Sequence, residues 1–249
     1  MQNVLAAFAL APGLAVGSFL NVVAARLPER RSIVRPRSSC GSCGTELAWY
    51  DNVPLLSWAL LRGRCRSCGV RIGLVYPAVE LATALLVAGC VLAFGASLHA
   101  LAAGVFCCAL VVVTATDLSH RIVPNRVVVP AAAVVLVVQT AARPSPEWAI
   151  GALGASAFLF ALAVAYPAGM GMGDVKLALL MGAALGRGVV IAIVLGTLAA
   201  LVPSAVLLAR HGSRARKQAI PFAPFLALGS VVSLFAGGAL AHWYLHSVV

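Results

Sequence analysis

Two aspartates, Asp117 and Asp174, lie next to long apolar segments, where charged residues are rare. The sequence holds only seven carboxylates; Asp117 follows the apolar run 111–116, and Asp174 ends a glycine-rich run at 169–173. A carboxylate at membrane depth is costly, so its presence indicates a function. Two carboxylates held together share one proton and titrate as a pair. One can act as general base on a water while the other protonates a carbonyl oxygen, which is the chemistry of peptide-bond hydrolysis.

Both aspartates also have a structural interpretation. Each could cap a helix, or pair with the nearby Arg121 or Lys176. The glycines before Asp174 favour the chemical interpretation, because a backbone without side chains lets a substrate strand approach closely. The segment 118–125 after Asp117 is typical of a turn, which would place this residue at the end of a membrane span.

Four of the seven cysteines form two Cys-x-x-Cys pairs, 21 residues apart: Cys40 with Cys43, and Cys65 with Cys68. Two such pairs can supply four thiolates to a tetrahedral zinc ion. The segment that carries them, residues 26–76, is too small to form a hydrophobic core of its own and needs a metal ion or disulfides to stabilise it. There are three alternatives: a pair of disulfides, an iron–sulfur centre and redox-active thiols. Disulfides are disfavoured because the segment is expected to lie in a reducing compartment. Cys90, Cys107 and Cys108 lie in apolar runs and are expected to be core residues.

An aromatic segment, residues 49–58, lies between the two cysteine pairs. It begins Trp49-Tyr50-Asp51-Asn52-Val53-Pro54 and ends at Trp58. Aromatic residues that flank an Asp-Asn-x-Pro turn suit a surface lying against a membrane interface. Packing of these rings on the cysteine knuckles explains the pattern equally well.

The composition requires a membrane as solvent. Hydrophobic residues make up 62% of the 249 residues and charged residues 10%, with a mean hydropathy of +1.01. Soluble domains carry about a quarter charged residues. A window of about 20 residues finds eight candidate spans, of which the fourth and sixth are short enough to be tilted, broken or partly re-entrant. They cover residues 4–25, 77–95, 98–116, 127–142, 148–168, 174–187, 189–209 and 221–245.

The predicted fold is therefore an all-α polytopic membrane protein with about eight spans and a small cytoplasmic zinc-knuckle loop domain. We expect three parts: a first transmembrane helix at 1–25, the zinc-binding loop at 26–76, and a transmembrane core at 77–249. The first span has no basic residue before it, and its first charge is Arg26. It is therefore expected to be a retained helix with its N-terminus outside, not a signal peptide.

The net charge of +11 agrees with this topology. With the N-terminus outside, the segments 26–76, 117–126, 169–176 and 210–220 are cytoplasmic and hold 16 of the 18 Lys and Arg residues; only Arg143 and Arg187 lie outside. Cytoplasmic loops collect such residues as the chain inserts. The basic charge is thus assigned to topology and contact with lipid, not to nucleic acid.

Several motifs together resemble the bacterial type IV prepilin peptidases. They are the segment 17–28 beginning Gly17-Ser18-Phe19-Leu20-Asn21, both cysteine pairs, Trp49–Pro54, Leu61–Cys65, Tyr76–Glu80, Asp117 with Ile122–Asn125, the Gly171-x-Gly173-Asp174-x-Lys176-Leu177 run, and Pro221–Phe225. The resemblance extends from about residue 13 to 230. The combination is specific, although Gly-x-Gly-Asp alone also occurs in presenilin-like proteases.

The resemblance implies an aspartic endopeptidase of the bacterial inner membrane, with Asp117 and Asp174 catalytic. Gly171, Gly173, Lys176 and Glu80 would support them. Its substrates would be prepilins and pseudopilins, cut after a glycine between a basic leader and an apolar helix. The pairs of cysteines would hold structural Zn²⁺.

Family members with such a loop often also methylate the new N-terminus with S-adenosylmethionine. The sequence has no glycine-rich nucleotide loop of a Rossmann-like methyltransferase. Methylation therefore follows from the resemblance alone, and Gly63, Arg64 and Glu80 are weak candidates for the cofactor site.

Three other functions fit parts of the pattern. A presenilin-like intramembrane protease of other substrates would use the same aspartates, but the large cysteine loop disfavours it. A proton-coupled transporter would use them as a relay, but would favour internal repeats, which the two Asp-bearing halves do not show. A zinc-knuckle adaptor leaves the aspartates unexplained.

Overall fold

The computed structural model describes residues 2–167, 170–212 and 220–248, and these form helices with no strand beyond two isolated bridges. By its contacts the chain divides into two compact units, residues 1–100 and 101–249. The elements are α1 (Gln2–Arg26), the 3-10 turn η1 (Trp49–Asn52), α2 (Leu56–Leu60), α3 (Val75–Phe94), α4 (Leu98–His120), α5 (Asn125–Ala142), α6 (Glu147–Ala165), α7 (Met172–Leu185), the 3-10 turn η2 (Gly186–Gly188), α8 (Val189–His211) and α9 (Ala223–Val248).

Each of the eight predicted spans coincides with one helix of 14 to 26 residues. By length and composition, seven stretches of the described residues can cross a membrane. The number is seven and not eight because α7 and α8 fall in one continuous apolar stretch, Met172–Arg210. The predicted all-α membrane fold is confirmed, and the chain is a multi-pass membrane protein. The predicted cytoplasmic segment 210–220 falls largely outside the described residues, as does Gly169 of the glycine-rich run.

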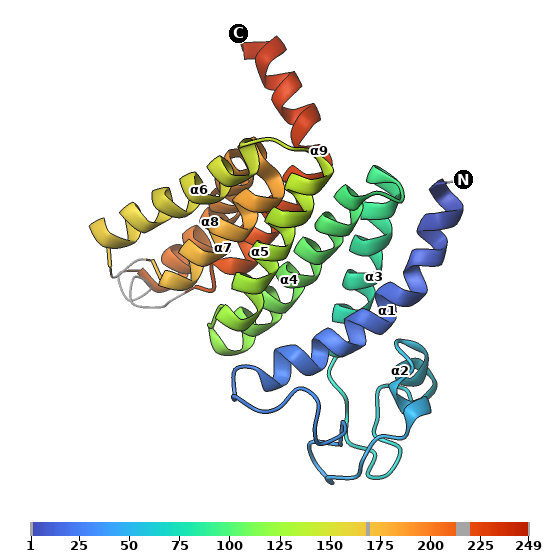
Figure 1. Cartoon of the computed structure of the whole chain (residues 1–249). Helices are drawn as coiled ribbons and strands as arrows, with labels where there is room; N and C mark the ends of the chain where they lie inside the picture. The colour runs from blue at the N-terminus through green and yellow to red at the C-terminus, as the bar shows by residue number, and fades with distance from the viewer. Residues whose placement is uncertain (1, 168–169, 213–219, 249) are drawn as a thin grey trace. The chain divides into compact units, whose positions relative to one another are not determined.

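The first unit is built on a hairpin of α1 and α3, which lie side by side in Figure 1. Gly13 and Gly17 allow the close approach: a Cβ on Gly13 would lie 2.8 Å from Ala84 Cα, and one on Gly17 would lie 2.7 Å from Glu80 Cα. One turn later, the Asn21 side chain donates to the Tyr76 carbonyl over 3.0 Å. Small residues spaced by four are a common way for membrane helices to pack.

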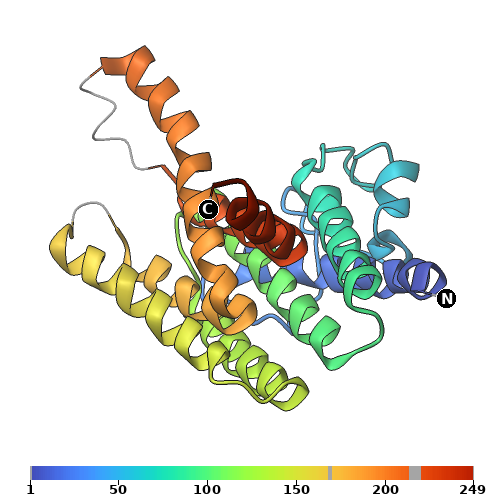
Figure 2. The same ribbon diagram turned by 90° about the horizontal axis from the view of Figure 1, so that it is seen from above.

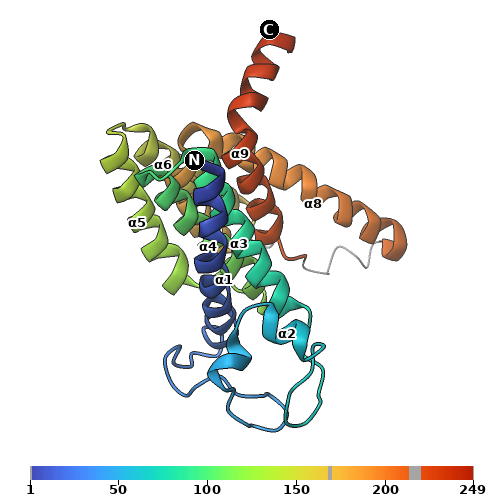
Figure 3. The ribbon, with the colours of Figure 1, turned by 90° about the vertical axis from the view of Figure 1, so that its right-hand side faces the viewer.

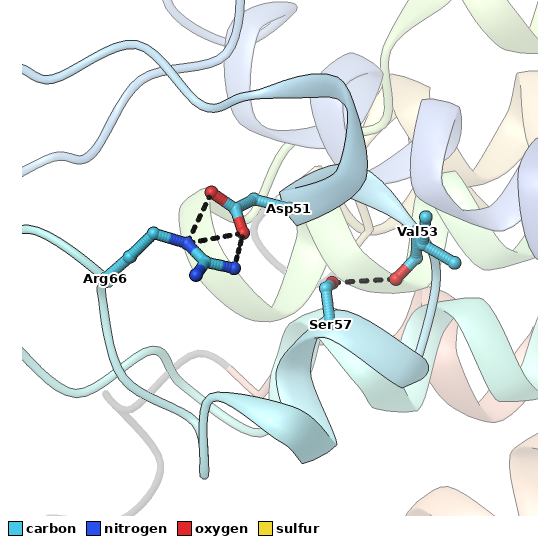
Figure 4. A network of polar contacts seen from close by, with 4 residues as sticks. All are labelled: Asp51, Val53, Ser57 and Arg66. Carbon is cyan, nitrogen blue, oxygen red and sulfur yellow. Dashed lines mark hydrogen bonds and ion pairs between the residues drawn. The ribbon is translucent and has the colours of Figure 1, made fainter.

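The loop between α1 and α3 folds around polar contacts. Arg66, in the second cysteine knuckle, forms a bidentate ion pair with Asp51 of η1, with a shortest N–O distance of 2.7 Å (Figure 4). In the same view the Ser57 hydroxyl donates to the Val53 carbonyl over 2.7 Å, which steadies the start of α2. The ion pair joins the aromatic segment to the second knuckle, whereas the Ser57–Val53 bond lies within the segment.

The second unit surrounds α7, which contacts α5, α6, α8 and α9. Leu177, Leu180 and Met181 of this helix are fully buried, and α7 buries residues on all its sides. A helix that is apolar all round belongs in the interior of a bundle. Figure 2 shows the neighbouring pair α5 and α6, yellow-green and yellow, from above.

Candidate active site

Asp117 lies within the last turn of α4, where it is 7% exposed. The turn predicted from residue 118 begins later, because α4 continues to His120 and the Arg121 N–H still donates to the Asp117 carbonyl. The Ser119 hydroxyl also donates to the Ala115 carbonyl, one turn earlier. Asp117 Oδ2 accepts the N–H of Ala223 over 3.1 Å. Ala223 is the first residue of α9, so Asp117 holds the start of the last helix.

Asp174 is the third residue of α7 and is half-buried. Its N–H donates to the Gly171 carbonyl over 3.1 Å, which closes the first turn. Its carboxyl group lies within Coulombic range of Asp117. Two residues separated by 57 positions in the sequence are thus brought to one place by the ends of α4 and α7.

The segments that flank the two aspartates contact each other. A Cβ on Gly173 would lie 2.9 Å from Val123 Cβ, and the Lys176 ammonium donates to Asn125 Oδ1 over 3.0 Å. The absence of a side chain at Gly173 therefore makes room for Val123. A Cβ on Gly171 would meet no atom closer than 3.9 Å, so there the backbone is open.

The structural interpretation of the two aspartates is supported only in part. Among the described residues neither Asp117 nor Asp174 forms a salt bridge, and Lys176 is bonded to Asn125 instead. Asp117 does cap a helix, although the helix is α9 and lies 106 residues further along the chain.

Three residues of the site were not singled out individually from the sequence: Ala223, Val123 and Asn125. All belong to short Pro-containing segments, Pro221–Phe225 and Ile122–Asn125, and the proline is the signal that marks both. Neither segment alone predicts which part of the site it will contact.

The four cysteines of the two pairs come together, with all their sulfur atoms within 4.8 Å of one another. The two knuckles have the same bonding: Gly44 N–H donates to the Cys40 carbonyl and Gly69 N–H to the Cys65 carbonyl, both over 2.9 Å. Both glycines adopt positive φ, near +72° and +71°, which glycine adopts at little cost.

The cluster can hold a metal ion. Sulfurs around a tetrahedral zinc at about 2.3 Å lie about 3.8 Å apart, and Cys40 and Cys68 Sγ are 3.8 Å apart. The hydroxyl and the backbone amide of Thr45 lower the pKa of the Cys43 thiol to about 6, whereas burial and the other three thiols raise the pKa of Cys68 to about 11, so that Cys43 is the more readily ionised of these two. None of the cysteines in the described residues forms a disulfide.

Comparison with known proteins decides the family. The sequence model of the bacterial peptidase A24 N-terminal domain matches residues 12–94, and that of the type IV leader peptidase family matches residues 104–208. A prepilin leader peptidase/N-methyltransferase of Bacillus subtilis (strain 168) is 37% identical over 241 residues, covering 94% of this chain and 95% of that protein. The chain belongs to the type IV leader peptidase family.

Other members of the family match at similar levels. A prepilin leader peptidase/N-methyltransferase of Burkholderia pseudomallei (strain 1026b) is 37% identical over 265 residues, covering 93% of this chain and 85% of that protein. One from Myxococcus xanthus (strain DK1622) is 53% identical over 125 residues, covering 50% of this chain and 37% of that protein. No solved structure matches the chain. Membership confirms the resemblance drawn from the motifs, and the chain is a membrane peptidase.

The remaining predicted residues of this leader peptidase lie in the first unit. Glu80 is 8% exposed, and its Oε2 accepts the Leu55 N–H over 2.9 Å. Gly63 has φ near +65°, and a Cβ there would lie 2.8 Å from the ring of Trp58. Arg64 is exposed and forms an isolated bridge with Arg71. Glu80 and Gly63 thus each have a structural contact.

Proposed function

We propose that the chain is an aspartic endopeptidase that removes the leader of type IV prepilins or pseudopilins after a glycine, with Asp117 and Asp174 as its catalytic pair. The single observation that carries the assignment is that the ends of α4 and α7, which bear Asp117 and Asp174, lie together, with their flanking segments in contact. Family membership supports the reaction, and the relatives' names supply the substrate class.

The reaction needs one ionised and one protonated carboxyl group. The ionised member removes a proton from a water, whose oxygen attacks the carbonyl carbon of the scissile bond. The protonated member gives its proton to the carbonyl oxygen, and the tetrahedral intermediate collapses when the amide nitrogen takes a proton and leaves. Two carboxylates that share one proton start in this state.

Fixed contacts support the geometry of the pair. The Ala223 N–H holds one oxygen of Asp117. The Gly173–Val123 contact and the Lys176–Asn125 hydrogen bond hold the first turn of α7 against the segment after Asp117. The open backbone at Gly171 leaves space where an extended substrate segment can lie.

The proposed orientation follows the distribution of basic residues, with the N-terminus outside and the aspartates at the cytoplasmic face of the bacterial inner membrane. A precursor with a basic leader and an apolar helix would insert with the leader inside by the same rule. Its scissile bond would then reach the level of the aspartates, where water is available.

The proposal includes two bound groups. The cysteines at 40, 43, 65 and 68 would hold a structural Zn²⁺ that joins the two knuckles. S-adenosylmethionine would supply the methyl group for the new N-terminus. The first unit has a cavity of about 1090 Å³ lined in part by Glu80, Trp58 and Asn21, and small-molecule sites measure about 300–1,000 Å³. Gly63 and Arg64 do not line this cavity.

Mass spectrometry of a prepilin-like substrate incubated with the purified chain tests the assignment. We expect cleavage after the leader glycine, lost in Asp117→Asn and in Asp174→Asn, and a further methyl mass only when S-adenosylmethionine is present. Glu147→Gln, which changes a carboxylate at the first residue of α6, is the matched control and should cleave normally. Full processing by either aspartate variant would rule out the mechanism; cleavage of other helices in preference to prepilins would favour the presenilin-like alternative.

A further inference from the structure

The loop of the first unit exposes large apolar side chains that neither knuckle covers. The exposed fractions are 81% for Trp49, 56% for Leu56, 74% for Leu60 and 70% for Leu74. These four residues are called the loop apolar surface below. Soluble surfaces avoid such groups of large apolar residues unless a partner covers them.

The two tryptophans of the aromatic segment differ in their surroundings. Trp58 is half-buried: its Nε1–H donates to the Ile72 carbonyl over 3.3 Å, and its ring lies against Gly63. Trp49 is largely exposed, and its one ring contact within the described part of the chain is an edge contact with Tyr50, at 5.6 Å between ring centroids. Packing on the knuckles therefore accounts for Trp58 and leaves Trp49 without a role.

The depth of α2 indicates what covers the loop apolar surface. The Leu55 N–H, just before α2, donates to Glu80 over 2.9 Å. Glu80 is five residues into the membrane helix α3, or about 7.5 Å along its axis. The start of α2 is therefore held to the first turns of α3, and Figure 3 shows α2 next to the lower end of that helix. Leu56 and Leu60, four residues apart, share one face of α2.

The charge of the same segment suits a lipid surface. Residues 26–76 hold nine of the 18 basic residues and three acidic ones. Two of the acidic residues, Glu29 and Asp51, are already paired with Arg31 and Arg66. A basic segment next to a membrane helix is attracted to anionic headgroups by about 1 kcal/mol per charge.

We propose that the loop apolar surface inserts into the headgroup layer of the leaflet in which α1 ends and α3 begins, and that the arginines of residues 26–76 bind anionic phospholipid there. The loop is then a membrane-contact module fixed at three places: by α1, by α3 and by its own apolar surface. The inference rests on the first unit alone and does not depend on the peptidase reaction.

Tryptophan fluorescence of the full chain in vesicles of phosphatidylcholine and phosphatidylglycerol tests this. The signal of Trp49 is the difference between the native chain and Trp49→Phe, a substitution at an open position that keeps an aromatic ring. We expect this signal to be blue-shifted from that of a water-exposed tryptophan and quenched more by lipids with a nitroxide near the headgroup than by aqueous iodide. Stronger quenching by iodide, or no quenching by either, would overturn the proposal.

A pair of variants at Leu60 extends the test. Leu60→Asp places a charge on the loop apolar surface, whereas Leu60→Met keeps it apolar. We expect Leu60→Asp to lose the lipid quenching of Trp49 and Leu60→Met to keep it. Equal zinc content in the two variants checks that the loop is folded. Equal lipid quenching in the two variants would contradict insertion. In vesicles without phosphatidylglycerol the lipid quenching should weaken; unchanged quenching would contradict the role of the arginines.

Discussion

The N–H of Ala223 reaches Asp117 from the start of the last helix, and its removal tests how far that contact positions the carboxylate. Ala223→Pro deletes the hydrogen while keeping a residue that suits the first position of a helix. A hydrogen bond to a charged group contributes roughly 1.5–3 kcal/mol, so we expect kcat to fall by about 10- to 100-fold. Initial rates on a prepilin-like substrate measure this. Ala223→Gly keeps the donor and is the control; equal rates in the two variants would contradict the role.

Gly173 gives a second test among single residues. Adding a methyl group in Gly173→Ala forces it against Val123, and overpacking costs about 1–3 kcal/mol. We expect low activity in Gly173→Ala and partial recovery in the double variant Gly173→Ala/Val123→Gly, which removes the Val123 Cβ that the new methyl group would meet. Rates and thermal unfolding are measured together. A folded double variant as inactive as the single one would mean that Gly173 serves substrate approach instead.

At the scale of elements, the two knuckles are expected to be joined by one zinc ion per chain. Cys43→Ser should lose the metal, because a serine hydroxyl is a poor replacement for a thiolate. Elemental analysis of the purified protein gives the zinc content. Cys108→Ser, in α4, should retain it. A Cys43→Ser protein that keeps a full zinc ion would rule out this ligand set.

The α6–α7 pair depends on glycine at the crossing. A Cβ on Gly151 of α6 would lie 2.7 Å from the Gly186 carbonyl, whereas one on Gly154, one turn later, meets nothing within 4 Å. Gly151→Ala should therefore lower stability by about 1–3 kcal/mol, with Gly154→Ala near neutral. Thermal unfolding in detergent compares them. A Gly151→Ala protein as stable as Gly154→Ala would mean that the helices separate without cost.

The helices and the candidate residues were predictable because their signals are local. Apolar runs of span length, a Gly-x-Gly-Asp run and paired Cys-x-x-Cys motifs can each be recognised in a short window. The contacts of Asp117 with Ala223 and of Gly173 with Val123 were not, since they depend on which helix ends meet, and no local pattern encodes that. The end of α4 was misplaced because its last turn is polar and resembles a loop.

For the whole molecule, the distribution of basic residues predicts one orientation. A phosphatase that is active only outside the cytoplasm should be active when fused after Arg143, in the turn before α6, and inactive when fused after Arg121. Arg143 is one of two basic residues on the predicted outer side. The opposite pattern of activity would invert the topology and move the aspartates to the outer face.

The central helix α7 is also short. Its 14 residues span about 21 Å, less than the roughly 30 Å of a bilayer's hydrocarbon core. At least one of its ends must therefore lie below the plane of the headgroups, and a cytoplasmic position for Asp174 requires that its N-terminal end, within one turn of that residue, is near the headgroups or recessed from them. For the catalytic pair proposed above, hydrophobic mismatch then becomes a variable of catalysis: a thicker bilayer would deepen the recess that water and the substrate must enter, and a thinner one would expose the carboxylates.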